Sequence, residues 1–314
     1  MRPSFILALM LLAAPALAAP PAPEKAIQFL DKTWVTYPRQ VQEFALKSAK
    51  YDPEQLLSGV TLSYRVPGLP EGSALTIFVF PHGRSEQEIG LKRALADITD
   101  GVLAAQRDNS YQDVVLGEVQ EFSVSAPPAT VIDTAESARE QPVAISSTAN
   151  APHVSEASSA PTSDDSIAAA VQAAAAPTTT HGRKLKMSFS YHGEPKQSIG
   201  YAFYRNLFLI TVRFTSPAAD LSPEQFEVMG DQAVRALVPS IDIQNFGNCG
   251  TIMVDLPENG QSEEESSQAG AISLIREMGR IATENCAASE GDSPDPVPTD
   301  HGRTELVYPH GTWD

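Results

Sequence analysis

The segment from residue 126 to residue 180 constrains the fold most, because it divides the chain into two blocks. It is rich in alanine, serine, threonine and proline and contains no aromatic residue. A segment of this composition cannot bury enough apolar surface to offset the entropy of folding. We therefore predict a disordered low-complexity insertion at 126–180, between two halves of ordered protein at 24–125 and 181–286, and a mobile tail at 287–314. The ordered blocks are large enough for one core or for two small ones.

Residues 1–18 have the pattern of a cleavable signal peptide. Arg2 gives a positive N-terminus, residues 5–14 form an apolar run, and small residues precede the expected cleavage point between Ala18 and Ala19. Cleavage there predicts a periplasmic or secreted protein, and an uncleaved membrane anchor is the alternative. No other segment approaches the roughly 20 apolar residues that a spanning helix needs, so we predict no transmembrane segment.

The charge balance excludes one class of partner. The chain has 22 lysine and arginine residues against 39 aspartate and glutamate residues, which gives a formal net charge of −17. Nucleic acid and anionic lipid headgroups repel such a chain. We therefore expect no nucleic acid, and a protein or small-ligand partner in the cell envelope. The acid excess is expected to serve solubility rather than recognition.

The chain contains two cysteines, Cys249 and Cys286. In an oxidising compartment an isolated pair most simply forms a disulfide. The alternative is a reactive thiol or a metal ligand, but no histidine or further cysteine lies at ligand spacing from either residue. The sequence therefore predicts a Cys249–Cys286 disulfide, which stabilises the fold by roughly 4 kcal/mol on the chain-entropy model.

Alternating apolar residues predict strands in the first block. Residues 60–66 and 74–80 alternate in this way across a turn, so we expect them to form a hairpin. A helix is predicted at 85–106, begun by a capping box of Ser85 and Glu88. Residues 112–124 are then predicted to return as a strand.

The second block begins with three more alternating segments, at 185–191, 197–204 and 207–215. Their short connections predict an antiparallel meander. A helix is expected at 222–238, because Ser222 suits the N-cap, Pro223 suits the first helical position and Gln225 completes a capping box.

The end of the second block is predicted to contain a short strand and a helix. The strand is expected at 251–256 and the helix at 266–286. Helical spacing places a set of small and apolar residues on one face of this helix, namely Ile272, Ile275, Gly279, Ala282 and Cys286. This face is expected to turn Cys286 toward the core, where it can meet Cys249.

These elements predict an α+β fold: an antiparallel β-sheet flanked by helices, an α/β/α sandwich, split by a long low-complexity insertion. The order resembles the PsbP and Mog-like fold, including bacterial envelope proteins of the DcrB type. The matching pieces are Leu62-Ser63-Tyr64 through Phe80, the helix at 85–106, and the run from Phe203 to Val212. The resemblance implies helices on both faces of the sheet and a binding or assembly factor without catalytic residues. The insertion and the extension after residue 240 depart from that pattern.

Common catalytic signatures are absent from the sequence. It lacks the HExxH and GxSxG patterns, a phosphate-binding glycine loop and a CxxC pair. We therefore expect no enzymatic activity and no cofactor. A hydrolase with a dispersed site is an alternative.

Five of the six histidines precede glycine, including His82, His192 and His310. Glycine permits positive φ angles at the ends of strands, so turn formation explains this pattern without a ligand. The alternative is that His82, His192 and His310 bind copper, zinc or nickel in the envelope, since histidine is a common ligand of these metals. The sequence thus predicts a non-enzymatic exported binding or assembly accessory protein, with an envelope metal-handling protein as the alternative.

Overall fold

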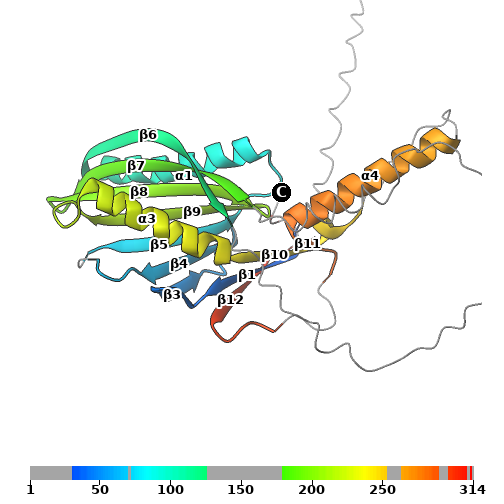
Figure 1. Cartoon of the computed structure of the whole chain (residues 1–314), viewed down its shortest axis with the longest axis horizontal. Helices are drawn as coiled ribbons and strands as arrows, with labels where there is room; N and C mark the ends of the chain where they lie inside the picture. The colour runs from blue at the N-terminus through cyan, green and yellow to red at the C-terminus, as the bar shows by residue number, and fades with distance from the viewer. Residues whose placement is uncertain are drawn as a thin grey trace, which may run out of the picture.

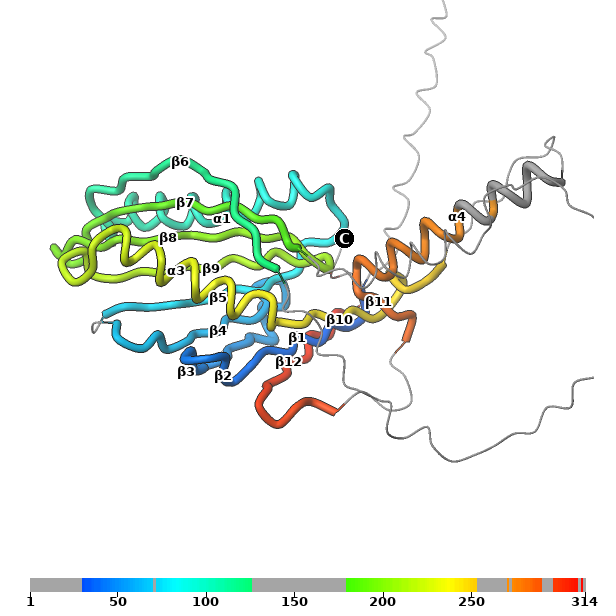
Figure 2. Tube along the Cα trace, in the orientation of Figure 1, coloured from blue at the N-terminus to red at the C-terminus, as the bar shows by residue number. Residues whose placement is uncertain are grey.

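The computed structural model of the chain describes residues 30–69, 72–125, 179–252, 263–289, 296–309 and 312. The predicted signal peptide with its cleavage point, the insertion residues 126–178 and His310 lie outside the described residues. The sequence predicts that Thr179 and Thr180 end the insertion, but both belong to strand β7. The described chain forms two β-sheets with three associated α-helices, as Figures 1 and 2 show.

The larger sheet has eight strands, and every neighbouring pair is antiparallel. From edge to edge they are β2 (Gln40–Val41), β3 (Phe44–Tyr51), β4 (Val60–Arg65), β5 (Ala74–Pro81), β9 (Phe208–Pro217), β8 (Glu194–Arg205), β7 (Thr179–Tyr191) and β6 (Tyr111–Ser125). The predicted hairpin of β4 with β5 and the predicted meander of β7, β8 and β9 are therefore confirmed.

The smaller sheet contains strands that the sequence did not predict. Its order is β11 (Cys286–Ala287), β10 (Asp242–Phe246), β1 (Lys32–Pro38) and β12 (His301–Val307). Strand β12 corrects the prediction of a mobile tail at 287–314, because it pairs with β1 along its whole length. The strand predicted at 251–256 is not found at Thr251 and Ile252, and its other residues lie outside the described chain.

Two helices cover opposite faces of the larger sheet. Helix α1 (Gln87–Arg107) brings Ala94 against Ala202 of β8. Helix α3 (Pro223–Leu237) brings Gly230 so close to Tyr201 that an added Cβ would lie 2.8 Å from its hydroxyl oxygen. Successive strand residues point to opposite faces, so the contacts of Tyr201 and Ala202 place α3 and α1 on different sides (Figure 1). The α+β class with mostly antiparallel strands is confirmed.

The largest hydrophobic cluster of the described residues joins both sheets. It includes Val35 and Ile243 from the smaller sheet, Leu62 and Phe214 from the larger sheet, and Phe226 from α3. Phe214 and Phe226 stack with ring centroids 4.5 Å apart. The two sheets and α3 therefore share one core, and burial of this size is the main stabilising contribution.

The two predicted capping boxes have different outcomes. At α3 the Ser222 hydroxyl accepts from the Gln225 backbone N–H at 3.2 Å, and the Gln225 side chain accepts from the Ser222 N–H. At α1 the predicted box of Ser85 and Glu88 is wrong, because Glu86 is the N-cap and makes no side-chain cap. The Ser85 N–H instead donates to the Tyr204 hydroxyl at 3.0 Å. The Tyr204 hydroxyl, which belongs to strand β8, therefore takes the place of the predicted local cap.

The described residues also include three 3-10 turns. They are η1 (Leu56–Ser58), η3 (Val238–Ser240) and η4 (Asn248–Gly250). Turn η4 follows β10 and carries Cys249, so it leads directly to the site described next.

Candidate protein-binding site on helix α4

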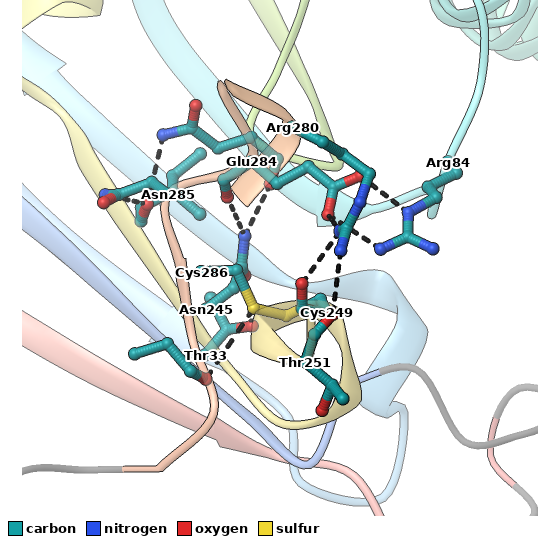
Figure 3. Close-up of a disulfide and its surroundings, with 12 residues drawn as sticks. Thr33, Arg84, Asn245, Cys249, Thr251, Arg280, Glu284, Asn285 and Cys286 are labelled. Carbon is teal, nitrogen blue, oxygen red and sulfur yellow. Dashed lines mark hydrogen bonds and ion pairs between the residues drawn. A yellow bond between two sulfur atoms is a disulfide. The ribbon is translucent and has the colours of Figure 1, made fainter. Parts of the chain in front are cut away.

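A disulfide joins turn η4 to strand β11 at the base of helix α4 (Glu263–Glu284). Cys249 and Cys286 are both buried, and their Cα atoms lie 5.9 Å apart (Figure 3). The predicted pairing is confirmed. Parallel pairing of β10 with β11 brings the two cysteines together, because Asn245 of β10 lies opposite Cys286.

Arg280 attaches the last turns of α4 to the disulfide loop. Its guanidinium donates to the Cys249 carbonyl at 2.8 Å and to the Thr251 carbonyl at 3.1 Å. It also pairs with Glu277 and Glu284, each at 2.7 Å. The hydrogen bond to Glu277 is the main cause of a raised pKa of Arg280. These charge-assisted bonds fix the side of α4 that faces the body.

Glu284 extends this attachment to the larger sheet. Arg84, in the loop after β5, donates to both carboxylate oxygens of Glu284, at 2.6 and 3.0 Å. The Glu284 side chain is 10% exposed and the Arg84 side chain 45% exposed, so the carboxylate is largely removed from water while the guanidinium stays partly exposed. Figure 3 shows Arg84 and Arg280 approaching Glu284 from two sides.

Two asparagines complete the base of the helix. Asn245, which is fully buried, donates to the Glu284 backbone carbonyl at 2.8 Å and accepts from the Thr33 hydroxyl at 2.8 Å. Asn285 has a φ of 48° and donates to the Ile243 carbonyl at 2.7 Å. A left-handed asparagine is a common helix C-cap. The backbone carbonyls of Glu284 and Asn285 therefore both accept hydrogen bonds from Asn245 of the smaller sheet.

From this base α4 leads away from both sheets (Figure 1). Its exposed side chains include three large apolar ones: Leu274 is 38% exposed, Ile275 is 70% exposed and Met278 is 57% exposed. The prediction that Ile275 and Gly279 face the core is therefore wrong, since an added Cβ at Gly279 would meet nothing within 4 Å. Cys286 also lies on β11 rather than on the helix. The face predicted from the apolar spacing shares only Ile275 with the exposed apolar side chains of the described residues.

The structure does not bring His82 and His192 together. His82 follows Pro81, which aligns with the Arg205 end of β8, whereas His192 precedes the Glu194 end of β8. The 12 residues of β8 separate these ends by about 40 Å at roughly 3.3 Å per residue. One metal ion cannot bind both histidines, and His310 is not described. Among the described residues no three histidine, cysteine or acidic side chains form a metal-binding group.

The His-Gly pairs have two structural roles. Gly83 and Gly193 have φ angles of 84° and 80°, which supports the turn interpretation. Gly182 and Gly302 instead lie within strands, beneath the aromatic rings of Phe203 and Tyr37. An added Cβ would approach each ring to 2.5 Å. The turn interpretation is therefore right for two pairs and wrong for two others.

Gly182→Ala is expected to destabilise the fold by about 1–3 kcal/mol, because the new methyl group collides with the fully buried Phe203 ring. The control is Gly279→Ala on the exposed part of α4, which we expect to be neutral or to stabilise by up to about 1 kcal/mol. Urea denaturation measures both changes. Equal midpoints for Gly182→Ala and the wild type would contradict the packing role of this glycine.

His82 gives the fold a pH dependence near neutrality. Burial lowers the pKa of His82 below 6.5, the charge of Arg93 lowers it further, and Asp97 partly opposes this shift. The unfolded chain therefore binds more protons than the folded chain between the folded pKa and 6.5. The free energy of unfolding should fall as the pH falls through that range, and His82→Gln should remove this slope. Urea denaturation across the range tests this, and an unchanged slope in the variant would contradict it.

The cluster that most resembles catalytic machinery surrounds Lys184. The Lys184 ammonium donates to Glu227 at 2.6 Å and to Asp231 at 3.1 Å, and the Tyr201 hydroxyl donates to Asp231 at 2.8 Å. Burial alone would lower the pKa of Lys184, but these carboxylates outweigh burial and raise it. A charged lysine held by two carboxylates is a poor general base and fits a structural ion pair that joins β7 to α3.

Two surface depressions lie outside the Lys184 cluster. One has a volume of about 200 Å³ and another about 550 Å³, and no histidine, cysteine or member of the Lys184 cluster lines either of them.

The chain matches no protein-family model and no curated protein. In the part of the chain described here, no helix combines the length and apolar character required to cross a membrane. Among the features described above, the exposed apolar side chains of α4, Leu274, Ile275 and Met278, are the strongest candidate site.

Proposed function

We propose that this protein is an exported, non-enzymatic binding or assembly accessory that presents α4 to a protein partner in the cell envelope. The observation that supports the proposal best is that one end of α4 is firmly attached to the body while the neighbouring turns are exposed. Its C-terminal turn is fixed by a disulfide and by the Arg84–Glu284–Arg280 ion pairs. Its next turns expose Leu274, Ile275 and Met278 to solvent. A firmly held helix with an uncovered apolar stripe is typical of a protein-interaction element.

Export is the second part of the proposal. The signal-peptide pattern at residues 1–18 supports it, and a disulfide is typical of proteins outside the cytoplasm. The contacts of α1 and α3 with opposite faces of β8 support an α/β/α arrangement of the PsbP and Mog-like type for the body. In that arrangement the body acts as a scaffold, and α4 is the binding element.

The test compares two variants of the tagged protein purified from its native envelope. Ile275→Asp with Met278→Asp places charge in the apolar stripe, and Thr283→Asp adds a charge on the polar side of the same helix. We expect quantitative mass spectrometry to find a partner that co-purifies with the wild type and with Thr283→Asp but is reduced at least tenfold with the double variant. Equal recovery of all partners from the three proteins would contradict the proposal.

A further inference from the structure

We propose that the outer edge of strand β6 is a further binding surface, which pairs with a short extended segment of another protein that carries apolar and basic residues. Strand β6 is one edge of the larger sheet, and among the described residues it pairs only with β7. Figure 1 shows it along the outer side of that sheet, away from α4. Binding at this edge is therefore independent of the function proposed for α4.

The backbone of this edge determines the kind of occupant. In an edge strand every second residue turns its N–H and C=O groups away from the neighbouring strand, and another extended chain pairs with these groups most completely. One end of the edge is already capped, because Arg235 of α3 donates to the Ser123 carbonyl at 2.8 Å. Within the described residues, no hydrogen bond caps the stretch from Val115 to Glu121 in this way. An added strand fits this stretch.

Three large apolar side chains of the stretch are exposed: Val115 is 61% exposed, Val119 is 52% exposed and Leu116 is 36% exposed. Leu116 and Val119 lie opposite Met187 and Leu185 of β7, which pack against α1, so these two share the α1 face of the sheet. Val115 lies opposite the residue of β7 that follows Met187 and is therefore on the other face. A strand beside β6 contacts both faces at once, because its own side chains alternate between them.

The charges of β6 favour a basic occupant. The strand contains Asp113, Glu118 and Glu121 but no lysine or arginine, and all three acidic residues are exposed. Arg183 lies 3.9 Å from Glu121 but makes its closer ion pair, at 2.8 Å, with Glu88 of α1. Opposite charges on adjacent strands stabilise their pairing and like charges oppose it. Lysine or arginine in the added segment is therefore favoured.

A second copy of this chain is a poor occupant of the same edge. Register shifts at 112–115 and 116–119 mark two β-bulges in β6, and bulges interrupt the run of backbone groups that a long strand needs. A second β6 would add the same bulges and would bring like charges together. A short segment needs fewer consecutive backbone groups, and a basic one compensates the acidic residues.

The test uses a fluorescently labelled peptide of alternating valine and lysine, whose binding to the full mature protein is measured by anisotropy. One control is a valine and glutamate peptide of the same pattern. The other is the lysine peptide with two adjacent backbone nitrogens methylated, which removes a donor from each edge of the peptide and leaves its side chains in place. We expect the unmodified lysine peptide to bind at least tenfold more tightly than either control.

Two matched variants locate the binding. Val115→Lys with Val119→Lys should weaken lysine-peptide binding at least tenfold, because lysine on an edge strand opposes further pairing and here also repels the peptide. Leu57→Lys with Val228→Lys adds the same charge at two other exposed apolar positions and should leave binding unchanged. Glu118→Gln with Glu121→Gln should reduce the preference for the lysine peptide severalfold.

Binding at β6 should survive changes on α4, so Ile275→Asp with Met278→Asp should bind the lysine peptide as the wild type does. The proposal is overturned if neither peptide binds, if the methylated peptide binds as tightly as the unmodified one, or if the α4 variant loses binding. Equal binding of the lysine and glutamate peptides would overturn the basic character of the partner. A dimer in sedimentation velocity that Val115→Lys with Val119→Lys dissociates would identify a second copy as the occupant instead.

Discussion

Replacing both Cys249 and Cys286 by serine is expected to lower the free energy of unfolding by about 4 kcal/mol. The two residues are 37 positions apart, and on the chain-entropy model closure of a loop of that size restricts the unfolded chain by about this amount. Urea denaturation, followed by far-ultraviolet circular dichroism, measures the change.

Reduction of the wild type provides the matched comparison. Dithiothreitol should shift the wild-type midpoint to that of the double serine variant and should leave the variant unchanged. Amide hydrogen exchange should increase in the central strands β8 and β9, whose amides exchange through global unfolding, as well as in α4, η4 and β11. A variant as stable as the oxidised wild type, or unchanged exchange in β8 and β9, would contradict the role assigned to the bond.

Lys184→Met is the second substitution expected to have a large effect. It removes the cation shared by Glu227 and Asp231 and leaves two carboxylates close together beside Tyr201. Loss of one partner from a buried ion pair costs about 3–5 kcal/mol, and the partial exposure of both carboxylates reduces the expected cost here to about 2–3 kcal/mol. Lys186→Met is the control, because Lys186 is 46% exposed and pairs only with Glu227, and it should cost no more than about 1 kcal/mol.

The same cluster predicts a change in acid sensitivity. Hydrogen bonds from Lys184 and then from Lys186 hold the pKa of Glu227 below 4.5. This group therefore contributes stability above its unfolded pKa, and the contribution is lost as the pH falls through its folded pKa. In Lys184→Met the folded pKa moves back toward 4.5, so the fall of stability below that pH should be shallower. A variant with the wild-type acid slope would contradict the assignment.

Local signals made part of the fold predictable. Helix α3 carries its own start in Ser222, Pro223 and Gln225, and the structure has the full capping box. The hairpin and the meander follow from period-two alternation with short turns. The smaller sheet leaves no comparable signal in the local sequence, because its paired strands lie far apart along the chain. Thr33 and Asn245, which hydrogen bond within it, are 212 residues apart. Strand β12 also follows a segment rich in proline and serine, which concealed it.

The candidate site was predictable in its chemistry but not in its geometry. An isolated cysteine pair in an exported chain indicates a disulfide, and the Cys249–Cys286 bond is present. The apolar spacing of α4 predicted a face that contains Ile275, but it does not indicate whether the body of the protein covers that face. The structure places Arg280 and Glu284 on the body side and leaves Ile275 outside. Only this tertiary arrangement distinguishes a core helix from a binding helix.

The most direct measurement places a photoreactive benzoylphenylalanine at position 275 of the protein in its native cells. We expect a discrete adduct between this chain and one other envelope protein. That adduct should be lost with Met278→Asp and should not form when the probe is at position 283 of the same helix. Equal labelling at 275 and 283, or a complete absence of adducts with other proteins, would mean that α4 does not bind a protein partner through Ile275.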